Sequence, residues 1–150
     1  MAPELDLHKR GDVMSVISEK VKEYLSANSK MNVLSTANKA GETNVAMFGS
    51  FLLSDDTTMM LMLGENNSYA NLKENPHAAL LVVLPGRTGM QTEGCRIYLK
   101  LRSIEDSGDM FDRIKAGVRA KVGNAAEVLK HLVIFDIVKT RPILDMGQMI

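Results

Sequence analysis

The chain has 150 residues, a formal net charge of +0 and an apolar content of 45%, which fits a single domain over 1–150 with its own core. A neutral chain has no general attraction for nucleic acid or for an acidic membrane surface, so we expect neither as a partner. Cys95 is the only cysteine, no apolar run reaches the roughly 20 residues that span a bilayer, and no signal peptide is evident. We therefore expect a soluble cytoplasmic protein without an internal disulfide.

The N-terminal part predicts a helix followed by antiparallel strands. Residues 1–11 are expected to form a loose arm, and Asp12 to Asn28 have the spacing of an amphipathic helix that Asp12 caps. Strands are expected over Met31–Ala37 and Thr43–Leu53. Gly49 inside the second strand indicates a bulge or a close backbone approach.

The stretch from Met59 to Pro76 has the most distinctive pattern. Met59–Leu63 shows no polar alternation, which predicts a strand buried on both faces, and Gly64 ends it. Ser68 is expected to cap a short helix over Tyr69–Lys73, which Pro76 stops. This arrangement offers backbone N–H groups at a helix N-terminus beside a buried strand, which suits an anion such as a phosphate.

The C-terminal half predicts further strands and helical segments. Cys95 to Arg102 alternates apolar and polar residues, as expected for a strand with one face in the core. Many strands, few helices and short turns predict a closed or partly open barrel. In chain order the expected elements are a strand over His77–Leu84, a loop over 85–94, the strand from Cys95, a helix carrying Met110, Phe111, Ile114 and Val118, a helical piece over Asn124–Lys130 that begins with a capping box to Glu127, and a last strand over Leu132–Val138.

No constellation of catalytic or metal-ligating residues is recognisable. His8, His77 and His131 have no second ligand at metal-binding spacing, and Cys95 lies on the apolar face of its strand. No nucleophile elbow and no Walker or Rossmann loop occurs, so we predict no catalytic residue and no metal site. The neutral donors Asn66 to Tyr69 either belong to an ordinary capped helix or hold a phosphate, and the residues alone leave both open.

A family resemblance favours the phosphate. The segments Leu34–Phe51, Met60–Gly64 and Ser68–Val82, with the Asn-Leu-x-x-Asn-Pro element at Asn71–Pro76, resemble the FMN-binding split-barrel family. This is the pyridoxamine 5′-phosphate oxidase-like group, and its short FMN-binding proteins are the most similar. The resemblance implies a mainly β fold, a six-stranded antiparallel split β-barrel with flanking α-helices. It also implies a homodimer with FMN at the interface.

The resemblance also implies a set of cofactor-binding residues. The strand around Ala46, Met47 and Phe48 would follow the edge of the flavin ring. The end of the next strand and the following loop would hold the ribityl phosphate. Arg87, in a later loop, is the nearest loop cation that could contribute to phosphate binding. The implied residues are Ala46, Met47, Phe48, Leu63, Gly64, Asn67, Ser68, Tyr69 and Arg87.

One departure from the family concerns the phosphate loop, where a lysine is usual beside a Ser or Thr. Here Asn67 and Tyr69 flank Ser68. Losing a charge-assisted contact costs ~1.5–3 kcal/mol, or about one to two decades of affinity. We therefore hold two hypotheses. The first is an FMN-binding flavoprotein acting as a small oxidoreductase or electron carrier. The second is a non-catalytic dimeric barrel that has lost tight FMN binding or takes another phosphate-bearing ligand such as a deazaflavin. A true pyridoxamine phosphate oxidase would need a longer chain.

Overall fold

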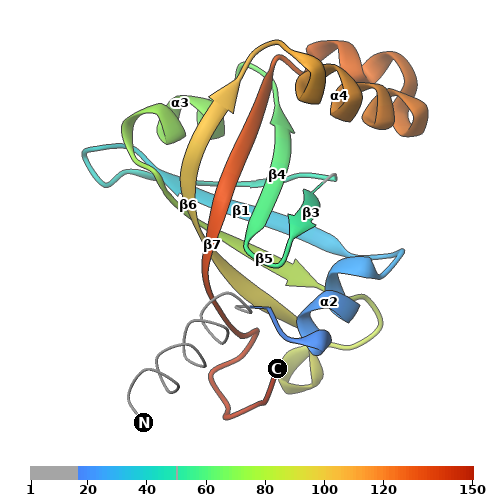
Figure 1. Ribbon diagram of the computed structural model, residues 1–150. Coiled ribbons are helices and arrows are strands. Elements are labelled where there is room, and N and C mark those ends of the chain that lie inside the picture. Colours follow the sequence, from blue (N-terminus) through green and yellow to red (C-terminus); the bar gives the residue numbers. More distant parts are fainter. Residues whose placement is uncertain (1–16, 50) are drawn as a thin grey trace, which may run out of the picture.

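A computed structural model describes residues 17–49 and 51–150. It confirms the mainly β class, since one antiparallel sheet has the strand order β2-β1-β5-β6-β7-β4-β3. Figure 1 shows this sheet strongly curved, with the helices at its periphery. The strands are β1 (Met31–Ala37), β2 (Thr43–Met47), β3 (Phe51–Asp55), β4 (Thr58–Leu63), β5 (His77–Val83), β6 (Gly94–Glu105) and β7 (His131–Pro142). The helices are α2 (Glu19–Ser26), α3 (Asn67–Glu74) and α4 (Asp109–Val122), with 3-10 turns η1 (Gly89–Gln91) and η2 (Gly123–Val128).

The prediction of one long strand over Thr43–Leu53 was wrong. The chain instead forms β2, which pairs with β1, and β3, which pairs with β4, and these two strands lie at opposite edges of the sheet. Gly49 lies between them, and a glycine weakens a strand because it has no side chain to pack. The described residues therefore form seven strands rather than six.

The burial of β4 on both faces is confirmed. One face, with Met59, Leu61 and Leu63, belongs to the main core inside the curved sheet. The other face, with Met60 and Met62, is buried beneath α4 in a second, smaller cluster. Two apolar environments explain why this strand shows no polar alternation. The main core also contains Val21 of α2, Leu34, Leu80, Ile97, Leu99, Val133 and Phe135.

The helix starts differ from the sequence prediction. Asp12 lies outside the described residues. The first helix that the structure describes is α2, and its cap is Ser18. In α3 the cap is Asn66, whose Oδ1 accepts from the Tyr69 N–H at 2.9 Å, and not Ser68. Asn66 lies two residues before Ser68 and is an equally good cap, so α3 begins earlier than predicted. The capping box at Asn124 does not form, and Glu127 instead bonds Arg119 on α4.

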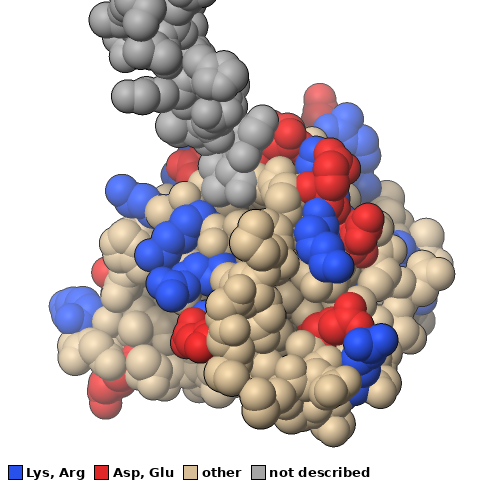
Figure 2. All heavy atoms as spheres, turned by 90° about the horizontal axis from the view of Figure 1, so that it is seen from below, with Lys and Arg blue, Asp and Glu red and all other residues tan. Residues whose placement is uncertain are grey.

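The surface agrees with a neutral chain. On the face seen in Figure 2 basic and acidic side chains lie interspersed around a broad uncharged area. None of the described helices is long and apolar enough to cross a membrane.

Candidate functional site

The N-terminus of α3 offers two uncommitted backbone donors. The Tyr69 N–H bonds Asn66 Oδ1, and the Ala70 N–H bonds the Asn66 carbonyl at 3.0 Å. Among the described residues the N–H groups of Asn67 and Ser68 have no such partner. These two donors point out of the first helical turn, where an anion is favoured.

Two side chains of α3 anchor it to the sheet. Ser68 is only 1% exposed, and its Oγ accepts from Asn44 Nδ2 of β2 at 3.4 Å. Asn71 Nδ2 donates to Thr36 Oγ1 of β1 at 3.1 Å. The Ser68 side chain therefore faces the sheet and anchors the first turn of α3 to β2.

Tyr69 directly follows Ser68, and its ring lies on a histidine. The rings of Tyr69 and His131 are stacked with centroids 3.6 Å apart and an angle of 5°. Lys73 Nζ lies 4.5 Å from the centroid of the Tyr69 ring. Residues four apart share a helix face, so Lys73 brings a positive charge back toward the first turn. Sequence reasoning missed Lys73, although the spacing from Tyr69 was visible.

His131 is held between two carboxylates. Its Nδ1 lies 2.6 Å from Asp106 and its Nε2 2.6 Å from Glu65. Burial lowers the pKa of His131, but the hydrogen bonds and charges of Asp106 and Glu65 together raise it above its ordinary value. Through these two contacts His131 links the loop before α3, the loop before α4 and the start of β7.

This cluster is not a metal centre. The two carboxylates bond opposite nitrogens of one ring, so they do not converge on a common point. Within 17–49 and 51–150 no group of three or more His, Cys, Asp or Glu side chains could hold a metal ion. No sequence motif indicates this cluster, because Asp106 and Glu65 lie 25 and 66 positions from His131 along the chain.

A small apolar cavity of about 200 Å³ lies between the β2–β3 corner, β4 and α4. Phe48, one of the predicted flavin contacts, lines it together with Met62 of β4. A Cβ on Gly64 would lie 2.7 Å from the Val128 carbonyl oxygen, so the absence of a side chain lets β4 end directly against η2. β4 forms one wall of the cavity, and the chain continues from the end of β4 into α3. The other lining residues are Gly49, Leu61, Val118, Val122, Ala125 and Leu129.

The remaining predicted contacts have mixed surroundings. Ala46 is half-buried and Met47 is 64% exposed at the end of β2. Leu63 is fully buried, and its carbonyl accepts from the Lys130 N–H at 2.9 Å, so its side chain serves the core. Asn67 is exposed beside the two free amides.

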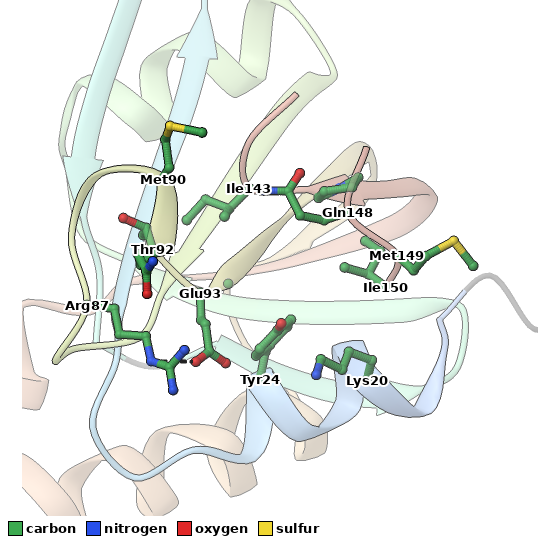
Figure 3. Close-up of a pocket in the computed structure, with 13 residues that line it drawn as sticks. Lys20, Tyr24, Arg87, Met90, Thr92, Glu93, Ile143, Gln148, Met149 and Ile150 are labelled. Carbon is green, nitrogen blue, oxygen red and sulfur yellow. Dashed lines mark ion pairs between the residues drawn. The ribbon is translucent and has the colours of Figure 1, made fainter. Parts of the chain in front are cut away.

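Within one chain the structure does not bring Arg87 to this end. Arg87 lies in the β5–β6 hairpin loop, whereas α3 precedes β5, so about 20 Å of strand separates them. Figure 3 shows Arg87 paired with Glu93 in a different cavity, beside Tyr24 and Ile143. The Arg87–Glu93 distance is 3.1 Å, so this guanidinium already has a carboxylate partner.

Cys95 offers no reactive thiolate. It is fully buried on the inner face of β6, as its alternation predicted, and burial raises the pKa of its thiol to about 12.

Comparison with known proteins identifies the family. The family model described as Pyridoxamine 5'-phosphate oxidase matches residues 17–141, so the chain belongs to that family. The comparison with curated proteins gave no match.

Solved structures support the same assignment. An FMN-binding protein from Syntrophomonas wolfei is 27% identical, with a TM-score of 0.72, and the alignment covers 95% of this chain and 93% of that one. HupZ of Group A Streptococcus shares 18% identity and a TM-score of 0.71, over 86% of this chain and 95% of that one. A protein described as an F420 reductase shares 14% identity and a TM-score of 0.65, over 83% and 98%. The last two show the fold alone.

Proposed function

We propose that this chain is an FMN-binding flavoprotein with the cofactor phosphate at the N-terminus of α3. Membership of the family and the similarity to an FMN-binding protein support this proposal. The observation that carries it is the pair of uncommitted N–H groups at Asn67 and Ser68, directly after the strand whose Met62 lines an apolar cavity. Most cofactor sites combine such apolar walls with a few placed polar groups.

Lys73 would supply the missing phosphate-loop cation in this arrangement. Its ammonium lies over Tyr69, and the stack of Tyr69 on His131 holds that ring in place. Protonated His131 neutralises part of the charge of Glu65 and Asp106, which lowers the repulsion that a phosphate would meet. The residues present therefore fit a phosphate ester, with a displaced lysine in place of the usual one.

FMN supplies one- or two-electron chemistry when it is bound, and the chain would bind, orient and shield it. Phe48 and the cavity beside it would exclude water from the ring. No acid or base is evident in the cavity lining, so the reaction class would be electron or hydride transfer without a protein proton donor. A small flavin-dependent oxidoreductase or an electron carrier fits this description.

A second copy of the chain would complete the site. Val45 and Met47 on β2 are 67% and 64% exposed, and Met31 on β1 is also exposed. The strand register places Val33 beside both Met47 and Leu81, which makes one continuous apolar sheet face. Exposed apolar faces of this kind mark protein interfaces. We therefore propose a homodimer through β1, β2 and β5, which brings the end of β2 and the ring site to the interface.

Titration of FMN against purified apoprotein tests the cofactor proposal. We expect saturable quenching of flavin fluorescence, and about tenfold weaker binding in Lys73→Gln. Lys39→Gln removes the same charge from the turn between β1 and β2 and is the matched control, with unchanged affinity. Equal affinity in Lys73→Gln and the wild type would place the phosphate elsewhere.

The second candidate is a barrel that has lost tight FMN binding or takes a deazaflavin. The neutral neighbours of Ser68, which are Asn67 and Tyr69, and two carboxylates close to α3 favour the loss of tight FMN binding, because both weaken the binding of a dianion. They give no preference for a deazaflavin, which is more acidic than FMN. Parallel titrations with FMN and a deazaflavin separate the candidates. Saturable binding of the deazaflavin alone, or of neither compound, would favour this second function.

A further inference from the structure

A wider groove, separate from the α3 end, runs between α2, β3 and α4 and has a volume of about 570 Å³. In Figure 1 these three elements lie along one side of the molecule. Part of the lining is apolar and comprises Leu25, Phe51, Leu52 and the nearly fully buried Met60 and Met62, while polar groups that include Ser26 and Asn28 form the rest. The groove adjoins the small cavity described above, since Gly49, Leu61, Met62 and Val118 line both.

Three basic side chains line this groove. Lys30 lies on the α2 side, and Arg113 and Lys121 lie two turns apart on α4. In the described part of the chain none of the three has a carboxylate within 4.0 Å, and Lys30 Nζ only donates to the Ala27 carbonyl at 3.1 Å.

Several other basic residues bond a carboxylate, whereas Lys39, Lys100 and Lys115 have no such partner among the described residues, so what sets the groove apart is that its unpaired cations line a concave surface. Lys22 bonds Asp56, Arg102 bonds Asp136 and Arg119 bonds Glu127. Arg119 is on α4 itself, and the same helix carries Arg113, Lys115 and Lys121 without a carboxylate partner among the described residues; of these, Arg113 and Lys121 line the groove. Unneutralised cations beside apolar side chains are complementary to a ligand with one anionic end and an apolar body.

Gly117 keeps this groove open. It lies midway between Arg113 and Lys121 on the same helix face, and no atom comes within 4 Å of a Cβ built on it. A glycine inside a helix is less favourable than an alanine, and no packing requirement in the described structure explains it here.

We propose that this groove binds a small amphipathic organic anion, with its carboxylate at Lys30, Arg113 and Lys121 and its apolar part on Phe51, Leu52 and Met60. The proposal goes beyond the FMN function and does not depend on it. The site is next to the cavity proposed for the flavin ring, so its occupant would lie beside that ring.

Calorimetric titration with decanoate, below its micelle concentration, tests the proposal. We expect saturable binding of one decanoate per chain, and much weaker binding of decanol and decylamine, which carry the same apolar part without the negative charge. The double variant Arg113→Gln/Lys121→Gln should bind decanoate about tenfold or more weakly. Lys39→Gln/Lys100→Gln removes the same charge outside the groove and should leave binding unchanged. Equal binding of all three compounds, or equal loss in both double variants, would overturn the proposal.

A steric variant gives a second measurement that does not rely on charge. Gly117→Leu fills the groove and replaces a poor helix former with a good one, so it should fold at least as stably as the wild type and lose decanoate binding. Ala116→Leu on the exposed side of α4 is the control and should keep it. Undiminished binding in Gly117→Leu would overturn the proposal.

Two further measurements test whether the groove is instead occupied by FMN or by a second copy of the chain. Unchanged decanoate affinity in the presence of FMN supports two separate sites, whereas competition would assign the groove to the flavin itself and would overturn the proposal. Absent decanoate binding, together with a fall from dimer to monomer mass in Gly117→Leu, would show that a second copy covers the groove and would overturn the proposal.

Discussion

The α3 end and the groove beside α4 differ in how their polar groups are satisfied. At the α3 end Ser68 and Asn71 bond the sheet, and His131 bonds two carboxylates beneath Tyr69. In the groove the cations Lys30, Arg113 and Lys121 have no carboxylate partner among the described residues. A buried ring whose two nitrogens are both bonded fixes local structure, whereas unpaired charges beside apolar side chains are available for a ligand. We therefore expect the unfolding free energy to depend more on the α3 end than on the groove.

Removal of His131 should have the largest effect on stability. His131→Ala leaves a cavity under Tyr69 and separates two carboxylates from their shared partner, so the unfolding free energy should fall by about 3 kcal/mol. Urea denaturation measures this fall. Arg113→Ala in the groove is the comparison and should change stability by less than about 0.5 kcal/mol. Equal losses in both variants would contradict the difference between the regions.

Tyr69→Lys should increase the affinity for FMN, because it places a cation in the loop proposed to bind the phosphate. We expect FMN to bind about 10 to 100 times more tightly, and Asn67→Lys to act in the same direction. The stack on His131 is lost in the first variant only, so Asn67→Lys separates the gain in charge from the loss of packing. Ala116→Lys on α4 is the control. No tightening in either loop variant would argue against α3 as the phosphate site.

The α3 end should also be the pH-sensitive region. The pKa of His131 is raised in the folded chain, so the folded state binds the proton more strongly than the unfolded state. The resulting stabilisation is fully present below the unfolded pKa of roughly 6.5 and is lost as pH rises through the higher folded value. The difference in unfolding free energy between the wild type and His131→Gln should shrink across that window. A difference that grows with pH would contradict a protonated ring.

Gly117→Ala should give the smallest change, in the stabilising direction. It relieves the glycine penalty in α4 without a steric conflict, so the unfolding free energy should rise by about 1 kcal/mol. Thermal unfolding measures this rise. Gly64→Ala, at the α3 end, should instead lower the unfolding free energy, because its Cβ would lie 2.7 Å from the Val128 carbonyl oxygen. A destabilising Gly117→Ala would show that α4 packs more closely at this position than the structure indicates.

Elements with a strong local pattern could be predicted from the sequence. The unbroken apolar run of β4, the alternation of β6 and the helical spacing of α4 each correspond to an element of that type. Burial of Cys95 followed from the alternation in β6. In these cases a single contiguous segment contains the information, because the period of its apolar residues reports the faces that it buries.

Features that depend on distant partners could not be predicted in this way. The break at Gly49 depends on β2 and β3 pairing with different strands, and alternation continues across it. The separation of Arg87 from α3 within one chain depends on which way the β5–β6 hairpin points. The contacts of His131 with Glu65 and Asp106 join three loops, and no local motif links these residues.

FMN titration of the purified wild-type protein, followed by its visible spectrum and flavin fluorescence, tests the central claim most directly. The proposal predicts saturable binding of one FMN per chain that weakens in Lys73→Gln and is retained in Lys39→Gln. A colourless protein whose fluorescence titration shows no saturation, while light scattering shows it folded and dimeric, would contradict the claim and leave a barrel without a flavin.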